Sequence, residues 1–250
     1  MNIDYDIKRH HRSRWDRCVY RNTHVLKNKF KVRDKVLLQE IEANYTMLRL
    51  RQLAIDSPEG GFDYTHFTAI HKHIFQDLYE WAGKPRKIDV CKYEDVLGGR
   101  SIEYAPCRQA AAMTAKALLD MTSVDWHALS HEEQATQMAY HMAVIWKIHL
   151  FRDGNTRTLS HFTLQYANHI GLHMDYLVLA KRRKEYRDAL ALACADHTYL
   201  ADKLDRNPLV AIVYEAMESG RKNLHAEPEP EPAAPEPEPE SAEREPEPDN

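Results

Sequence analysis

The sequence lacks any long apolar run. No stretch of its 250 residues reaches the roughly 20 consecutive apolar residues that a membrane-spanning helix needs. The N-terminal segment MNIDYDIKRHHRSRW is basic and polar and has no apolar core of the kind found in secretory signals. We therefore expect a cytoplasmic protein without a membrane partner. Secretion into a host by a route that leaves no such signal remains the alternative.

Cysteine is scarce and scattered. The four cysteines are Cys18, Cys91, Cys107 and Cys194. No two of them form a CxxC pair, which argues against a zinc ribbon or a disulfide framework and for a reducing compartment.

Histidine is abundant, with 15 residues, but the HExxH motif is absent. The spaced pairs His71 with His73 and His169 with His173 could chelate a metal. We interpret them instead as surface or helix-packing residues.

The net charge of −4 hides an uneven distribution. Residues 226–250 hold eight of the twelve prolines, and ten acidic residues against one arginine, in a Glu-Pro alternation. Such a segment cannot form a helix or bury apolar surface, so we expect a disordered acidic tail. Residues 1–17 form a basic N-terminal arm. No aromatic platform or recognition helix follows this arm, so we do not expect a nucleic-acid partner.

A helix, a tight loop and a second helix lie at the centre of the chain. Apolar residues recur at helical spacing up to Trp146 and again from Leu159 to Ile170. Between them, Asp153-Gly154-Asn155 interrupts the periodicity, because glycine tolerates positive φ and Asp and Asn favour turns. Gly171 fits the end of the second helix.

This loop is expected to bind an anion. The first turn of a helix carries unpaired N–H groups and the positive end of the helix dipole, so Gly154, Asn155 and Thr156 can present donors to phosphate. Arg157 adds a forked cation. Asp153 offers an oxygen ligand suited to Mg²⁺, which binds one or two carboxylates together with nucleotide phosphates.

The segment HLFRDGNTRTLS, residues 149–160, resembles the signature of the Fic family. The matching residues are His149, Phe151, Asp153, Gly154, Asn155 and Arg157. The sequence departs from the signature at three positions. Leu150 replaces the usual Pro, and Thr156 stands where Gly or Lys is common. Ser160 stands where the signature has a second Arg.

The resemblance implies protein adenylylation, with ATP as substrate and Mg²⁺ as cofactor. His149 would act as general base on a Ser, Thr or Tyr hydroxyl of a target protein, because an imidazole can take a proton near pH 7. Asp153 would bind the metal, Arg157 would balance charge on the leaving pyrophosphate, and Phe151 would anchor the loop. Because Ser160 replaces the second Arg, one alternative is Doc-like phosphotransfer or another nucleotide donor. A separate alternative is a non-catalytic helical binding module.

The expected fold is mainly α, a Fic-type helical bundle with a short β-hairpin flap, over residues 18–217. One early helix has Leu37, Ile41, Tyr45 and Leu48 on a single stripe. Helices are also expected over residues 108–121, 130–148, 181–200 and 208–217, and Ser130 begins a capping-box pattern. Residues 178–180 are expected to lead into the helix that follows. By the resemblance, Tyr186 on that helix is expected to wall the adenine pocket.

Residues 86–106 change to a period of two and predict a two-stranded hairpin. By the resemblance, Ile102, Glu103 and Tyr104 belong to the flap that pairs with an extended stretch of the target through its main chain. The alternative is a hairpin that only covers the core.

Cationic residues 181–184 could hold phosphate, although a charge run at the start of a helix is usually solvated. The family's inhibitory helix reads Ser or Thr, three residues, Glu, and then Gly or Asn. The sequence has no match to that pattern. We therefore expect either a separate small antitoxin as partner or no restraint.

Overall fold

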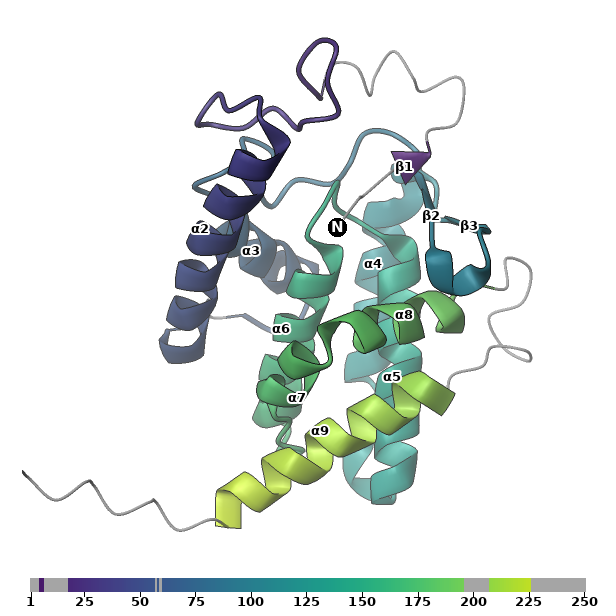
Figure 1. The fold of residues 1–250 in the computed structure, drawn as a ribbon. Coiled ribbons are helices and arrows are strands. Elements are labelled where there is room, and N and C mark those ends of the chain that lie inside the picture. The colour runs from purple at the N-terminus through teal and green to yellow at the C-terminus, as the bar shows by residue number, and fades with distance from the viewer. Residues whose placement is uncertain (1–4, 7–17, 57, 59, 196–206, 226–250) are drawn as a thin grey trace, which may run out of the picture.

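A computed structural model describes residues 5–6, 18–56, 58, 60–195 and 207–225 (Figure 1). The acidic tail and most of the basic arm lie outside the described residues, so the predictions for them stay predictions.

The described residues form a mainly helical fold with one small sheet, which confirms the predicted fold class. The strands are β1 (Tyr5–Asp6), β2 (Cys91–Tyr93) and β3 (Ser101–Glu103). The α-helices are α2 (Lys35–Ile55), α3 (Tyr64–Phe75), α4 (Cys107–Thr122), α5 (His131–Ile148), α6 (Asn155–His169), α7 (Tyr176–Lys181), α8 (Arg183–Ala193) and α9 (Asn207–His225). Two short 3-10 helices, η2 (Asp95–Leu97) and η3 (Trp126–Ala128), complete the described elements.

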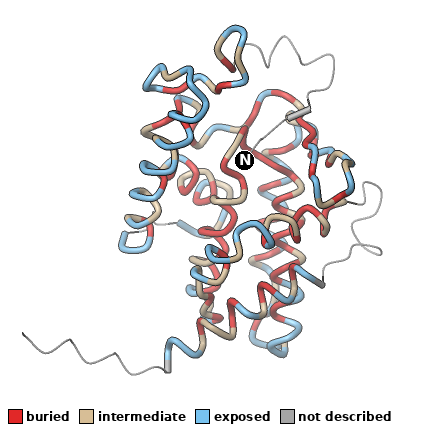
Figure 2. Tube along the Cα trace, in the orientation of Figure 1, coloured by how far each residue is buried: buried red, intermediate tan, exposed pale blue. Residues whose placement is uncertain are grey.

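Helix α5 is the centre of the core and packs against α4, α6, α8 and α9. Figure 2 shows that buried residues run along much of its length. The predicted capping box is present: the Ser130 side chain accepts from the Glu133 N–H, and the Glu133 carboxylate accepts from the Ser130 N–H. This cap fixes where α5 begins and therefore where its other end places the signature loop.

The sheet has one more strand than the sequence predicted. Strands β2 and β3 form the expected antiparallel hairpin, with Lys92 opposite Ile102. Strand β1, from the N-terminal arm, pairs with the other edge of β2 and places Tyr5 opposite Lys92. The two-stranded prediction was therefore incomplete. A strand of two residues is too short to show an alternating pattern in the sequence.

The chain between α6 and α9 also differs from the prediction. Residues 178–180 are helical, and the predicted single helix over residues 181–200 is interrupted at Arg182, which separates α7 from α8. Helix α9 continues eight residues beyond the predicted end at Met217. Gly220 lies within α9, where the helix closely approaches the backbone at His173. A Cβ at that position would lie 2.1 Å from the His173 carbonyl oxygen.

Helix α2 forms an outer wall of the molecule. It packs against α3, and Arg49 fixes it there through ion-paired hydrogen bonds of 2.6 and 2.8 Å to the Asp77 carboxylate. The apolar stripe read from the sequence is largely exposed, with Leu37 at 46% and Leu48 at 51%. Instead, Leu38 and Leu53 are buried. No helix in the described ranges is long and apolar enough to cross a membrane.

Candidate active site

His149 follows the last turn of α5 in a left-handed conformation, with φ 54° and ψ 58°. Its ring stacks on Tyr104, with 3.8 Å between the ring centroids, and meets Trp146 edge-on at 5.7 Å. Only 5% of the residue is exposed. Burial, followed by the nearby positive charge of Arg86, lowers the pKa of His149 to about 3. The imidazole is therefore neutral at physiological pH.

Arg86 holds the backbone on which His149 depends. Its buried guanidinium donates to the carbonyl oxygens of His149 at 2.7 Å and Ile88 at 2.6 Å, and also to that of Ala105. The Arg86 N–H donates to the Leu150 carbonyl oxygen at 3.0 Å. One side chain thus joins the end of α5, where the helix dipole is negative, to both flanks of the hairpin.

The loop after His149 is held by side chain to main chain hydrogen bonds. The Asn155 amide bonds both the N–H and the carbonyl oxygen of Phe151, at 2.9 and 2.8 Å. The Phe151 ring is fully buried and stacks on His71 at 3.7 Å. Nδ1 of His71 accepts from the Gly83 N–H at 2.8 Å, so its Nε2 carries the proton and donates to the Asp153 carbonyl oxygen at 3.1 Å. Both His71 nitrogens are therefore engaged and cannot ligate a metal.

Helix α6 begins without a side-chain cap. Its N-cap is Gly154, with φ 77°, and a Cβ there would lie 2.3 Å from the Phe75 ring. The Gly154 N–H donates to Oδ1 of Asp153 at 2.6 Å. The N–H groups of the first turn, Asn155 to Arg157, have no acceptor within their own helix. This is the arrangement predicted to bind an anion, with the Gly154 N–H committed to Asp153 in the structure.

Arg157 is paired with an acidic residue that the sequence analysis missed. Its guanidinium donates to Oε1 of Glu42 on α2 at 2.6 Å and lies 4.6 Å from the centre of the Phe75 ring. The Tyr79 hydroxyl donates to Oε2 of Glu42, also at 2.6 Å. Burial and the Glu42 charge raise the pKa of Asp153 to about 6, and the Arg157 charge opposes this shift.

The residues around Glu42 do not match the inhibitory pattern of the family. Leu38 stands where the inhibitory pattern asks for Ser or Thr, and Ala43 stands where it asks for Gly or Asn. Of the three residues that the pattern requires, only the glutamate is present here, and its partner becomes visible only in the contact between α2 and α6.

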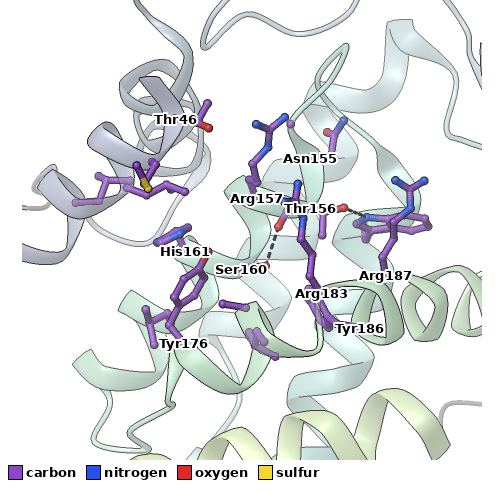
Figure 3. A pocket seen from close by; sticks show the side chains of 18 of the residues that line it. Thr46, Asn155, Thr156, Arg157, Ser160, His161, Tyr176, Arg183, Tyr186 and Arg187 are labelled. Carbon is purple, nitrogen blue, oxygen red and sulfur yellow. Dashed lines mark hydrogen bonds between the residues drawn. The ribbon is translucent and has the colours of Figure 1, made fainter. Parts of the chain in front are cut away.

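His149, Glu42 and residues 153–157 line one end of a cleft of about 2700 Å³. The cleft is bounded by α2 on one side and by α6, α7 and α8 on the other. Figure 3 shows part of its lining. Thr156 lies in this lining and its hydroxyl accepts from Nε1 of Trp146 at 2.9 Å. Tyr186 also lines the cleft, although only 2% of the residue is exposed.

The three predicted flap residues are not part of the cleft lining, and one of them, Tyr104, lies against His149. Ile102 is fully buried and Tyr104 covers the His149 ring, whereas Glu103 is exposed. Among the described strands β3 is an outer strand of the sheet, since β2 lies between it and β1. Any strand that pairs with it would therefore bind mainly through the main chain.

Few metal-ligating side chains converge in the described part of the chain. Within the described ranges, no group of three or more His, Cys, Asp and Glu residues is placed to hold a metal ion. Asp153 offers a carboxylate beside the α6 N-terminus, and the nearby Glu42 carboxylate is engaged by Arg157 and Tyr79. This fits Mg²⁺ that takes most of its ligands from phosphate and water, and does not fit an all-protein cage.

Comparison with known proteins identifies the family. A model of the Fic/DOC family matches residues 61–167. A probable protein adenylyltransferase of Sinorhizobium fredii, y4lH, is 34% identical over 169 residues, which are 67% of this chain and 83% of that protein. The chain therefore belongs to the Fic/DOC family. The protein adenylyltransferase VbhT of Bartonella schoenbuchensis is 31% identical over 154 residues, but the match spans only 31% of that longer protein.

Solved structures show the same fold. The FIC domain of Bep8 from Bartonella sp. 1-1C superimposes with a TM-score of 0.66 at 20% identity, covering 80% of this chain and 94% of that one. A Fic domain from Bartonella quintana with bound ADP gives 0.64 at 23% identity, with the same coverage.

The buried histidines predict that the protein loses stability in mild acid. Burial lowers the pKa values of His71 and His149 to about 3 and that of His161 to about 4. Below pH 6.5 the unfolded chain binds protons at these sites that the folded chain does not, so stability falls as pH decreases from 6.5 towards 4. Each group contributes up to about 1.4 kcal/mol per pH unit.

Urea unfolding at pH 7.5, 6.5, 5.5 and 4.5 measures this loss. The variant His161→Gln removes one titrating group and leaves the carboxylates unchanged. Its free energy of unfolding should fall less steeply with acid than that of the wild type. Equal slopes for the two proteins would show that His161 is not held neutral by the fold.

Proposed function

We propose that the chain transfers AMP from ATP to a hydroxyl side chain of a target protein. The observation that carries this proposal is the convergence, at one end of the cleft, of the uncapped start of α6 with Asp153, Arg157 and the neutral His149. The names of the two relatives and the ADP bound to a protein of the same fold support it.

His149 is the proposed general base. Its neutral imidazole takes the proton from a Ser, Thr or Tyr hydroxyl as the oxygen attacks the α-phosphorus of ATP. The bond between that phosphorus and the oxygen bridging to the β-phosphate breaks, and pyrophosphate leaves. The His149 ring stacks on Tyr104, and Arg86 binds the His149 carbonyl oxygen. Together these contacts fix the orientation of the imidazole.

The first turn of α6 would bind the phosphates through the N–H groups of Asn155, Thr156 and Arg157. Phe151 anchors the loop that leads into this turn. Asp153 would hold Mg²⁺, which neutralises phosphate charge when it is bound. The Arg157 side chain would face the departing pyrophosphate once it separates from Glu42. Transfer of this kind depends on position and charge more than on covalent chemistry, which suits such a site.

The remaining contacts of the proposed site are less direct. Tyr186 would wall the adenine end of the cleft. The main chain of β3, from Ile102 through Glu103 to Tyr104, would pair with an extended segment of the target protein. A small antitoxin stays a proposed partner, although Glu42 already gives the chain a restraint of its own on Arg157.

One observation favours a second candidate function. Ser160 replaces the second arginine of the signature, and its hydroxyl donates to the Thr156 carbonyl oxygen at 2.8 Å. A hydroxyl cannot substitute for a forked guanidinium. The nucleotide could then bind in reverse and deliver its γ-phosphate, as in Doc proteins.

Replacement of His149 tests the proposed reaction. The variant His149→Ala should lose at least about 100-fold in AMP transfer, since general-base catalysis contributes roughly 10² to 10⁴. It should still melt at a higher temperature when Mg²⁺ and ATP are added, because the phosphate site remains.

Labelling of a lysate with ATP carrying the label at the α- or the γ-phosphate measures this transfer. Label from the γ-position alone would indicate phosphotransfer. Undiminished transfer by the variant would reject His149 as the base. Label from neither position, with melting unchanged by Mg²⁺ and ATP, would indicate a non-catalytic binding module.

Glu42 should compete with the nucleotide for Arg157. The variant Glu42→Gln removes the charge and keeps an acceptor for the Tyr79 hydroxyl, so Arg157 becomes free to bind phosphate. The dissociation constant for ATP with Mg²⁺, measured by calorimetry, should fall by about 10-fold, the lower end expected for a charge-assisted contact. Glu40→Gln, on an exposed position of α2, is the control. Equal affinity in the two variants would contradict the competition.

A further inference from the structure

The start of α6 lacks one cation that the family signature places there. Ser160 occupies the position, and its hydroxyl is turned back onto the helix by its bond to the Thr156 carbonyl oxygen. Arg157, the remaining arginine of the signature, is bound by Glu42. A triphosphate carries several negative charges, so a second cation near this turn would change the affinity of the site.

The four cationic residues 181–184, at the junction of α7 and α8, have different surroundings in the structure. Arg182 pairs with Glu185 at 2.6 Å and also with Glu215. Lys184 pairs with Asp188 at 2.5 Å. Lys181 is exposed and does not line the cleft.

Arg183 alone of these four lines the cleft without an acidic partner among the described residues. Figure 3 shows its side chain extending from the start of α8 into the cleft, towards the part of α6 that carries Thr156 and Ser160. The run that reads as a solvated helix start therefore contains one side chain directed at the candidate site.

One further observation places this guanidinium near Arg157, at the proposed phosphate end of the cleft. Burial raises the pKa of Tyr176, and the positive charges of Arg183 and Arg157 both oppose that shift, so both arginines lie within electrostatic range of one phenol. Arg187, one turn further along α8, is committed to Glu94 through contacts of 2.8 and 3.1 Å.

We propose that Arg183 replaces the missing second arginine of the signature and binds the outer phosphates of the nucleotide from α8. The guanidinium would approach the phosphates from the α8 side of the cleft, while the N–H groups of the first turn of α6 approach from the other. This inference rests on the proposed function, because it assumes that the cleft takes a nucleoside triphosphate. With Arg183 in this role, the site would bind a nucleoside triphosphate more tightly than a monophosphate.

Calorimetry with ATP and with AMP, each in the presence of Mg²⁺, tests the inference. The variant Arg183→Ala should weaken ATP binding by about 10-fold or more, the scale of a lost charge-assisted hydrogen bond. AMP binding should change by less than about twofold, since AMP lacks the outer phosphates. Arg183→Lys keeps the positive charge but loses the forked guanidinium. Its affinity for ATP should therefore lie between those of the wild type and Arg183→Ala.

Lys181→Ala is the matched control, because it removes a positive charge from the same run outside the cleft. It should leave both affinities unchanged. Because Arg183 is exposed, its replacement should shift the melting temperature little, and this shift is measured first.

The possible outcomes distinguish failure of the role of Arg183 from failure of the proposed function. If the wild type binds ATP and Arg183→Ala binds it equally well, the role of Arg183 is overturned and the proposed function stands. If Arg183→Ala weakens ATP and AMP equally, the residue supports the pocket and does not read the outer phosphates, which also overturns the role. If the wild type binds no nucleotide, both the role and the proposed function fail.

Discussion

The open first turn of α6 is the feature on which the site depends. Helices α2, α3, α5 and α7 begin with an Asp or Ser side chain that accepts from their first turn, whereas α6 begins at a glycine that offers no side chain. Its N–H groups stay available because the loop before them is fixed by other contacts. Phe151 is buried against His71, and Asn155 bonds the Phe151 main chain. The fold thereby keeps a positive helix end facing a cleft.

Charge around this turn is balanced by residues that come from distant parts of the chain. Glu42, on α2, holds Arg157 and adds to the raised pKa of Asp153. Arg183, on α8, adds a cation that has no acidic partner in the described part of the chain, on another wall of the cleft. Under the proposed function, the acidic side chain that compensates Arg157 in the free protein is the group that an anionic nucleotide would have to displace. The affinity for a nucleotide would then be the difference between the ion pairs it forms and the Glu42–Arg157 pair it breaks.

The sequence predicted the parts of this structure that rest on local patterns. The capping box at Ser130, the helix–loop–helix around Gly154 and the hairpin over residues 86–106 follow from periodicity and turn chemistry, and the structure contains all three. The break at Arg182 did not follow, because a helix interrupted by one residue keeps nearly the same apolar spacing. Strand β1 did not follow because two residues carry no period.

The acidic and basic partners of the site could not be read from the sequence. Glu42 lies 115 residues from Arg157 along the chain and is brought to it by the packing of α2 on α3. His71 is fixed by the carbonyl oxygen of Asp153 and the N–H of Gly83, which are main-chain groups without any sequence signal. Such pairings depend on how helices cross, and helix crossing is not a local property of the sequence.

The most direct test of the account is a two-dimensional ¹⁵N–¹H spectrum of the labelled protein during titration with ATP and Mg²⁺. The account predicts that the backbone amide signals of Asn155, Thr156 and Arg157 shift most, because these N–H groups receive the phosphates. Signals that stay in place at the start of α6, while other regions of the protein respond to the nucleotide, would contradict it.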